Sequence, residues 1–295
     1  MNAPLELSVV IPVYRSAETL RELVERLTRA LEAALGAERS ELVFAVDASP
    51  DDSLERLLEL RRSARGGPAL RVLVGARNVG QHAALRAAFR AARGRALLVM
   101  DADLQYAPED LPRFLAAWQR GADLVAGVRR ARADSYLGRV LPSALFNAFA
   151  RWWSGVALRD FGCGFCLLDA RLVPELERAG ARRRFLKPLL GALARTPVEL
   201  EVESAPRATP SAYGFAKLAR LAGAFAVGWS PRPFVWLGVL GAISLACALL
   251  EIGAADVPCG SIGLALLGSS AALLAAHRAL QREPEAGLWE ELDAP

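Results

Sequence analysis

Short apolar runs alternate with amphipathic stretches along the first half of the chain. Each run has the length and the apolar, often β-branched, content of a buried strand. Helical periodicity follows most of them, and alternation of this kind predicts an α/β domain with a doubly wound, mostly parallel sheet. The predicted strands are Leu7–Val13, Glu41–Val46, Leu70–Val74, Ala96–Met100 and Asp123–Val128.

The fourth of these strands leads directly into polar residues, namely Asp101, Asp103 and Gln105. In an extended chain alternate residues point to the same side, so these three side chains could direct oxygens toward one point. Open α/β sheets bind ligands at the carboxyl ends of their strands, and hard oxygen ligands suit Mg²⁺ or Mn²⁺. The alternative is a pair of solvated loop carboxylates, and the triplet alone does not decide between the two.

Two long apolar runs lie near the C-terminus. Residues 229–250 carry no charge after Arg232, and residues 257–276 carry none at all. Each run is about long enough to cross a bilayer as a helix, whereas the alternative is a helical hairpin buried in a soluble fold. Basic residues flank the pair and the link is acidic, which predicts that both ends of the chain are cytoplasmic.

We therefore expect a cytoplasmic domain over residues 1–228, two transmembrane helices within 229–280 and a polar, disordered tail at 281–295. Two segments of the first part, 135–158 and 211–228, combine apolar with basic residues at helical spacing. Either could be an ordinary core helix or a helix that lies in a membrane interface.

Composition and charge narrow the partners. The chain is 53% hydrophobic with a mean hydropathy of +0.24, a net charge of +4 and a pI near 9.1. Nearly all of the basic residues are arginines. A modest excess of arginine over acidic residues fits an anionic lipid surface or a phosphate-bearing substrate. No nucleic-acid-binding motif is present, so nucleic acid is not an expected partner. The start of the chain lacks a signal-peptide pattern, which favours a cytoplasmic catalytic domain.

Cys163 and Cys166 form a Cys-x-x-Cys pair without the second pair or the context that zinc or redox chemistry needs, so we expect two small buried residues. The predicted sheet also lacks a glycine-rich phosphate loop. A nucleotide would therefore have to be held through a metal and side chains.

Six short motifs occur in a fixed order along the chain. They are Val10–Tyr14, Val46–Ser53, Arg77–His82, Asp101–Gln105, Gly127–Arg130 with Asp134–Ser135, and Asp160–Cys163. Together they resemble the family-2 glycosyltransferases with the GT-A fold, which is a Rossmann-like nucleotide-diphospho-sugar transferase domain. More narrowly, the chain resembles polyprenyl-phosphate glycosyltransferases, such as dolichyl-phosphate mannosyltransferase and the bacterial undecaprenyl-phosphate sugar transferases. The likeness runs from about Leu7 to Leu250.

The resemblance implies a role for each of several residues. Pro12, Tyr14, Asp47 and Asp101 would bind the nucleotide. Asp101, Asp103 and Gln105 would hold Mg²⁺ or Mn²⁺ on the donor diphosphate. Arg129, Arg207 and Ser211 would face the acceptor phosphate, and Asp103, Arg129 and Arg207 would form the catalytic set.

The implied protein is an integral membrane enzyme of the cell envelope, expected in a bacterial inner membrane. It would move one sugar from a UDP- or GDP-linked donor to a polyprenyl phosphate, with inversion. A phosphate acceptor is already anionic and needs no strong base, while a metal and arginines stabilise the leaving diphosphate. The resemblance also allows a homo-oligomer. The sequence does not distinguish the sugar, UDP from GDP or the lipid length.

Two other functions stay open. A polysaccharide or cell-wall glycosyltransferase would use a different acceptor, but the Gln-x-x-Arg-Trp pattern of processive synthases is missing because Ala148 stands where glutamine would. A catalytically silent nucleotide-sugar-binding or scaffold protein is suggested by departures from the family pattern. Basic residues expected at Cys166 and Ala212 are absent, and Val46 replaces an expected aspartate.

Overall fold

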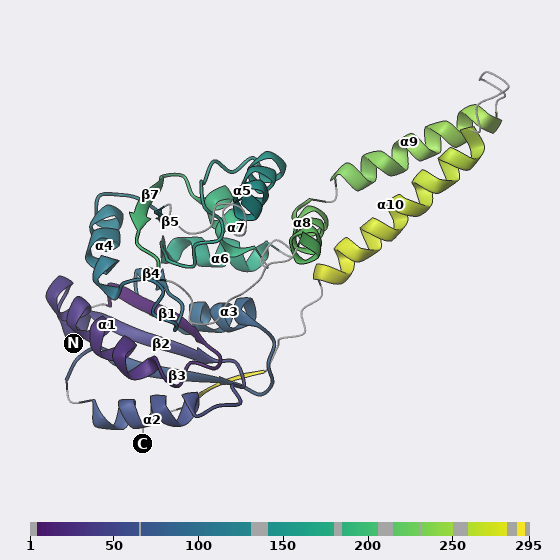
Figure 1. Ribbon diagram of the computed structural model, residues 1–295. Coiled ribbons are helices and arrows are strands. Elements are labelled where there is room, and N and C mark those ends of the chain that lie inside the picture. Colours follow the sequence, from purple (N-terminus) through teal and green to yellow (C-terminus); the bar gives the residue numbers. More distant parts are fainter. Residues whose placement is uncertain are drawn as a thin grey trace. The chain divides into compact units, whose positions relative to one another are not determined.

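The computed structural model describes residues 5–64, 66–130, 141–179, 185–205, 215–230, 232–249, 259–281 and 288–292. Eight of its strands form one sheet in the order β7-β5-β6-β4-β1-β2-β3-β8 (Figure 1). The strands are β1 (Leu7–Val13), β2 (Ser40–Val46), β3 (Ala69–Gly75), β4 (Ala96–Val99), β5 (Leu124–Arg129), β6 (Cys166–Asp169), β7 (Pro197–Val202) and β8 (Trp289–Leu292). The helices are α1 (Leu20–Ala34), α2 (Ser53–Ser63), α3 (Gln81–Ala91), α4 (Leu111–Gln119), α5 (Leu141–Ser154), α6 (Val173–Arg178), α7 (Leu186–Leu193), α8 (Phe215–Trp229), α9 (Arg232–Leu249) and α10 (Cys259–Gln281).

The predicted α/β domain with a mostly parallel sheet is confirmed. β1 pairs in parallel with β2 and β4, β2 with β3, and β5 with β7. β6 runs antiparallel between β4 and β5, where Cys166 lies opposite Val99. The carboxyl ends of β1 to β5 therefore share one edge of the sheet, and the segment that leads into β6 enters at that same edge.

The hydrophobic core forms where helices cover the central strands. In α1 the leucines at positions 20, 23, 27 and 31 are completely buried, which is the apolar stripe of an amphipathic helix. α1 contacts α2 and α4, whereas α3 packs against β1 and β2. Phe114 of α4 meets Phe165 edge-on, with ring centroids 4.6 Å apart. These contacts hold the strand ends rigidly in place.

The end of the chain differs from the expectation of a disordered tail. β8 pairs antiparallel with β3, so that Trp289 lies opposite Gly75 and Leu292 opposite Val72. A side chain at Gly75 would lie 3.2 Å from the Trp289 ring, so the glycine leaves room for the indole. Four residues of the expected tail thus form an edge strand. The sequence did not indicate it, because the partner strand lies some two hundred positions earlier.

A second compact unit comprises residues 180–185 and 214–283 and contains α8, α9 and α10. Within it, α9 and α10 pack against each other, and the Ser270 hydroxyl donates to the Phe234 carbonyl at 2.6 Å. His277 Nδ1 lies 2.6 Å from the Val227 carbonyl oxygen, which links α10 to α8. Helix α8 groups with this unit, on the other side of the boundary expected at residue 228, whereas strand β8 groups with the sheet.

The two apolar runs do form helices, α9 and α10. Searched over the described residues, however, no helix is both long enough and apolar enough to cross a membrane. The predicted transmembrane spans 229–250 and 257–276 are therefore not confirmed, and residues 250–258 between the helices lie outside the described part of the chain.

Candidate active site at the carboxyl ends of the strands

A cluster of hydroxyl and carboxylate groups fixes the loop after β1. The backbone amides of residues 15–17 donate to Ser49 Oγ, Ser53 Oγ and Asp51 Oδ2 at 2.7, 3.1 and 3.1 Å. Asp51 Oδ1 also accepts from both serine hydroxyls, at 2.5 and 2.7 Å. Burial raises the pKa of Asp51, but these hydrogen bonds outweigh it and hold the pKa below its ordinary value. Asp51 thus organises the loop, a role that the sequence motif did not reveal.

The loop held in this way carries Tyr14, which was predicted to bind the nucleotide. Tyr14 is 45% exposed, and the Arg15 guanidinium carbon lies 5.5 Å from its ring centroid. Arg15 has a positive φ of 53°, which only a well-supported turn maintains in a non-glycine residue. Pro12 lies in β1 opposite Ala45 and is half-buried. The nucleotide-binding roles of Pro12 and Tyr14 stay predictions.

Asp47 at the end of β2 has a clear structural function. It is almost fully buried, and its two carboxylate oxygens accept from the backbone amides of Val79 and Gly80 at 2.8 and 2.7 Å. The Asn78 side chain donates to the Asp47 carbonyl at 3.3 Å. Asp47 therefore fastens the β3–α3 loop to β2. A direct contact with the nucleotide remains a prediction.

Asp101 lies between two segments that are distant in sequence. Its Oδ1 accepts from Gln81 Nε2 at 2.6 Å, at the first turn of α3. On its other side, a Cβ atom at Gly164 would lie only 2.5 Å from Asp101 Oδ2. Only a glycine at position 164 lets the backbone before β6 approach the carboxylate this closely. Gln81 lies within the Arg77–His82 motif and Gly164 just after the Asp160–Cys163 motif, but no motif indicates that they position Asp101.

The next residues do not follow the extended path that the sequence analysis assumed. β4 ends at Val99, and Leu104 has a left-handed φ of 54°. Simple alternation therefore does not align Asp103 with Gln105. Instead the Gln105 backbone amide donates to Asp103 Oδ1 at 3.1 Å, and Asp103 is exposed. The Gln105 side-chain nitrogen is buried, and the described residues offer it no hydrogen-bond partner.

The turn that carries both aspartates is anchored to α1. Thr19, at the N-cap of this helix, donates its hydroxyl to the carbonyl of Ala102 at 2.6 Å. Over the described part of the chain, no group of three His, Cys, Asp or Glu side chains could hold a metal ion. The predicted ligand set contains only Asp101, Asp103 and the amide Gln105. A cation bound there would need additional oxygens from a substrate.

Arg129 and Asp160 form a two-pronged ion pair at the end of β5. Arg129 Nε and Nη2 donate to Asp160 Oδ2 and Oδ1 at 2.8 and 2.9 Å, and the Arg129 amide donates to Oδ2 at 3.2 Å. Burial raises the pKa of Asp160, but the bonds from Arg129 outweigh it, so the net shift is downward. The guanidinium side chain is 37% exposed. Arg129 is thus a fixed cation at the edge of the site, and its partner Asp160 was not predicted.

The two cysteines are small buried residues, as expected. Cys163 and Cys166 are free and almost fully buried. Burial raises the pKa of Cys166 to about 12, so its thiol stays protonated at neutral pH. The predicted acceptor residues Arg207 and Ser211 lie outside the described residues, as do Asp134 and Ser135.

Comparisons with known proteins identify the family and the fold. The profile described as "Glycosyl transferase family 2" matches residues 8–169. The fold is similar to that of glucosyl-3-phosphoglycerate synthase from Mycobacterium tuberculosis. Its complex with Mn²⁺, UDP-glucose and phosphoglyceric acid has a TM-score of 0.51 at 18% identity, covering 75% of this chain and 78% of that one. Its complex with Mn²⁺, UDP and glucosyl-3-phosphoglycerate has a TM-score of 0.50 at 16% identity, covering 86% and 82%.

Proposed function

This chain belongs to glycosyl transferase family 2, and from that premise we propose that it transfers a sugar from a nucleotide-sugar donor to the phosphate of a polyprenyl lipid, with inversion and with the help of Mg²⁺ or Mn²⁺. The family match and the GT-A fold support the glycosyltransferase activity. We propose in addition that the acceptor is a lipid phosphate, that the protein works at a membrane, and that the residues have the roles given below.

One structural relationship carries the proposal. The segment before β6 contacts both Asp101 and Arg129 with residues two positions apart. A Cβ at Gly164 would lie 2.5 Å from Asp101 Oδ2, and one at Gly162 would lie 2.7 Å from Arg129 Nη2. A carboxylate that can bind a cation and a fixed guanidinium therefore face the same short stretch of backbone. A donor diphosphate near these residues would meet the Arg129 guanidinium on one side and, once a cation is bound by Asp101, that cation on the other.

The cation would be held by Asp101, Asp103 and the Gln105 amide. Gln105 Oε1 is the atom that would bind the cation. Its Nε2 is buried without a partner among the described residues, and as a hydrogen-bond donor it suits an oxygen of the nucleotide-sugar. The M. tuberculosis complexes contain Mn²⁺ together with UDP or UDP-glucose. When bound, such an ion would neutralise charge that develops on the leaving diphosphate.

The side chains of this protein then have simple tasks in the reaction. An oxygen of the acceptor phosphate attacks the anomeric carbon, the bond from that carbon to the donor phosphate breaks, and the nucleoside diphosphate leaves. Because the acceptor is already anionic, no proton has to be removed. Arg129, held by Asp160, stabilises phosphate charge, and Arg207 and Ser211 are proposed to bind the acceptor phosphate.

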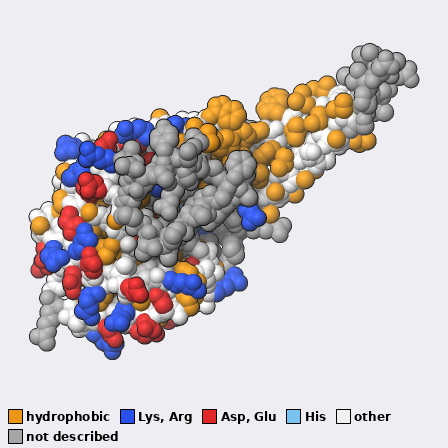
Figure 2. Space-filling model, viewed as in Figure 1, with side chains coloured by type: hydrophobic (Ala, Val, Ile, Leu, Met, Phe, Trp, Pro, Cys, Tyr) orange, Lys and Arg blue, Asp and Glu red, His pale blue; other side chains and the backbone are white. Residues whose placement is uncertain are grey.

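A membrane location is supported by exposed apolar side chains. On α5, Trp152 is 76% exposed and Leu145 57%. On α9 the side chain of Trp236 is 66% exposed, and Figure 2 shows hydrophobic side chains gathered along the helical pair on the face drawn. Large exposed apolar patches mark membrane or protein contact sites. We propose that these helices contact lipid and guide the polyprenyl chain.

The deciding experiment uses the full chain in membranes with Mg²⁺ or Mn²⁺, a short polyprenyl phosphate and a panel of labelled UDP- and GDP-sugars. We expect label to move into the organic phase from one donor, and EDTA to stop that transfer. A parallel reaction with 3-phosphoglycerate instead of lipid tests a soluble acceptor. Label found only in an aqueous product would refute the lipid acceptor but keep the glycosyltransferase.

A further inference from the structure

Helix α7 contributes a buried lysine, Lys187, to the site at the carboxyl ends of the strands. The chain uses arginine almost everywhere, since only two of its 36 basic residues are lysines, at positions 187 and 217. Lys187 is 5% exposed. Lysine side chains are almost never fully buried unless they are paired, so this one requires an explanation.

The ammonium group bridges two pieces of backbone. Lys187 Nζ donates to the Gly127 carbonyl at 2.5 Å and to the Cys163 carbonyl at 3.2 Å. These two carbonyls belong to β5 and to the segment before β6. The two backbones are close at this point, because the Gly127 amide donates to the Phe165 carbonyl at 2.9 Å and a Cβ at Gly127 would lie 2.7 Å from that oxygen. From α7, Lys187 connects β5 and the segment before β6 through these two hydrogen bonds.

Both bridged residues lead directly to the candidate active site. Two residues after Gly127 comes Arg129, and three residues before Cys163 comes Asp160, so the bridge flanks their ion pair. The residue after Cys163 is Gly164, which faces Asp101. A shift of the bridged backbone would therefore move the guanidinium of Arg129 and, at the same time, push Gly164 against the carboxylate of Asp101.

The bridge also determines the charge of this cluster. Arg129 and Asp160 neutralise each other, whereas Lys187 donates to the neutral carbonyls of Gly127 and Cys163. The Asp101 carboxylate faces the neighbouring Gly164, so two cations and two carboxylates balance in this cluster. The charge of Lys187 also contributes to the lowered pKa of Asp160. Without Lys187 the cluster would carry one negative charge, which repels a phosphate more strongly in a poorly solvated place than it would in water.

We propose that Lys187 is a positioning residue for sugar transfer, which holds β5 against the segment before β6 and offsets the negative charge of Asp101, so that the Arg129 guanidinium can receive a phosphate. This inference rests on the function proposed above. It assigns to α7 a cation that no sequence motif indicated. Because the ammonium is compact and its three donors can rotate, it reaches both carbonyls from one point.

The test replaces Lys187 by methionine, which keeps the length and removes the charge and the donors. Transfer is measured at varied donor concentration in the membrane assay. We expect kcat to fall by about 10- to 100-fold, as for other supporting residues around a charged site, with the donor KM changed by less than about threefold. The reason is that charge on the leaving diphosphate grows in the transition state. Should Lys187→Met not fold, Lys187→Gln, which retains one donor group, is measured in the same way.

Arg71→Met is the matched control. Arg71 is also a buried cation that donates to a backbone carbonyl, that of Ala91, but it belongs to the amino-terminal part of β3 and not to the candidate site. This control is expected to lower the melting temperature while leaving kcat within about twofold. If Lys187→Met retained the kcat of the parent protein, or lost it only in proportion to a loss of folded protein, the inference would be wrong.

Binding of UDP with Mn²⁺, followed by calorimetry, separates this inference from the proposed function. If the parent protein transfers no sugar to any acceptor, the proposed function fails. In that case, UDP·Mn²⁺ affinity still tests the charge that Lys187 contributes. Free UDP carries the full charge of the leaving diphosphate, which the sugar nucleotide lacks, so Lys187→Met is expected to weaken UDP·Mn²⁺ binding several-fold although the donor KM changes little. Equal affinity of parent and variant, when neither transfers sugar, would overturn the role of Lys187 as well.

Discussion

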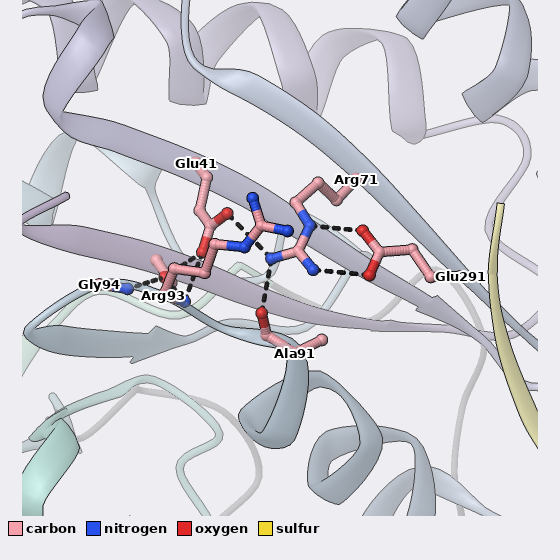
Figure 3. A network of polar contacts seen from close by, with 7 residues as sticks. Glu41, Arg71, Ala91, Arg93, Gly94 and Glu291 are labelled. Carbon is pink, nitrogen blue, oxygen red and sulfur yellow. Dashed lines mark hydrogen bonds and ion pairs between the residues drawn. The ribbon is translucent and has the colours of Figure 1, made fainter. Parts of the chain in front are cut away.

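Arg71 and Glu291 form a two-pronged ion pair although 220 residues separate them in the chain. Arg71 Nε and Nη2 donate to Glu291 Oε1 and Oε2 at 2.6 Å each (Figure 3). The remaining guanidinium nitrogen donates to Glu41 and to the Ala91 carbonyl, at 3.1 and 2.5 Å. One side chain of β3 thus ties the last strand of the sheet to β2 and to the end of α3. Strand β8 is therefore an integral part of the sheet.

Replacing Glu291 by glutamine should destabilise the sheet domain. The variant leaves a largely buried guanidinium with weaker partners, and we expect a loss of about 1–2 kcal/mol in the free energy of unfolding, measured by urea denaturation. Glu290→Gln is the control, because Glu290 is an exposed neighbour on the same strand. An unchanged urea midpoint for Glu291→Gln would show that the ion pair contributes nothing.

The assignment of the metal site predicts that Asp103→Asn abolishes turnover. A neutral amide binds Mg²⁺ or Mn²⁺ much more weakly than a carboxylate does, and we expect kcat to fall by at least about 100-fold. Membrane association should be unaffected. Glu59→Gln, an exposed carboxylate on α2, is the control. Full activity of Asp103→Asn would remove this residue from the metal site.

Gly164→Ala tests the close approach to Asp101. The new Cβ would lie 2.5 Å from Asp101 Oδ2, so the carboxylate has to move. Because this atom is the end of a side chain, we expect little loss of stability but a fall in activity of about 10-fold or more. Gly268→Ala on α10 serves as control, since no atom lies within 4 Å of a Cβ built there. Equal activity of the two variants would contradict the proposed position of Asp101.

The free energy of unfolding should depend on pH through the carboxyl group of Asp169. Burial raises the pKa of this carboxyl, but hydrogen bonds from Arg171 and Trp118 outweigh it and lower the pKa from 3.8 to about 2. The folded protein therefore gains stability from the ionised group above pH 3.8, and this gain disappears as the pH falls through about 2. Urea unfolding of the parent protein and Asp169→Asn should differ at pH 6 and converge near pH 2. A difference that stays constant over this range would contradict the assignment.

The proposed membrane contact predicts that Trp152→Glu weakens binding to anionic vesicles. A charge in place of an exposed indole on α5 loses apolar burial and repels the lipid surface. We expect a several-fold lower partition coefficient in a sedimentation assay. Val198→Glu, at another exposed apolar position, is the matched control on β7. Equal loss in both variants would indicate a general charge effect and not a contact through α5.

The positions of strands β1 to β5, and of the polar loops that follow them, can be predicted from the sequence alone. The runs that form β1, β2, β4 and most of β5 are buried on both faces, so nearly every residue is apolar and the signal is local. Position at the end of such a strand also placed Asp47, Asp101 and Arg129 at one edge of the sheet, because parallel strands share the direction of their carboxyl ends.

The contacts that hold the side chains of Asp47, Asp101 and Arg129 exist only in the folded chain. The partners of Asp101 and Arg129, which are Gln81 and Asp160, come from distant segments, and no periodicity records such pairings. The turn at Leu104 replaced the extended path assumed for the metal ligands, since one left-handed residue cancels the alternation of side chains. Lys187 and β8 were missed for the same reason: the backbone groups that they bind become neighbours only when the chain has folded.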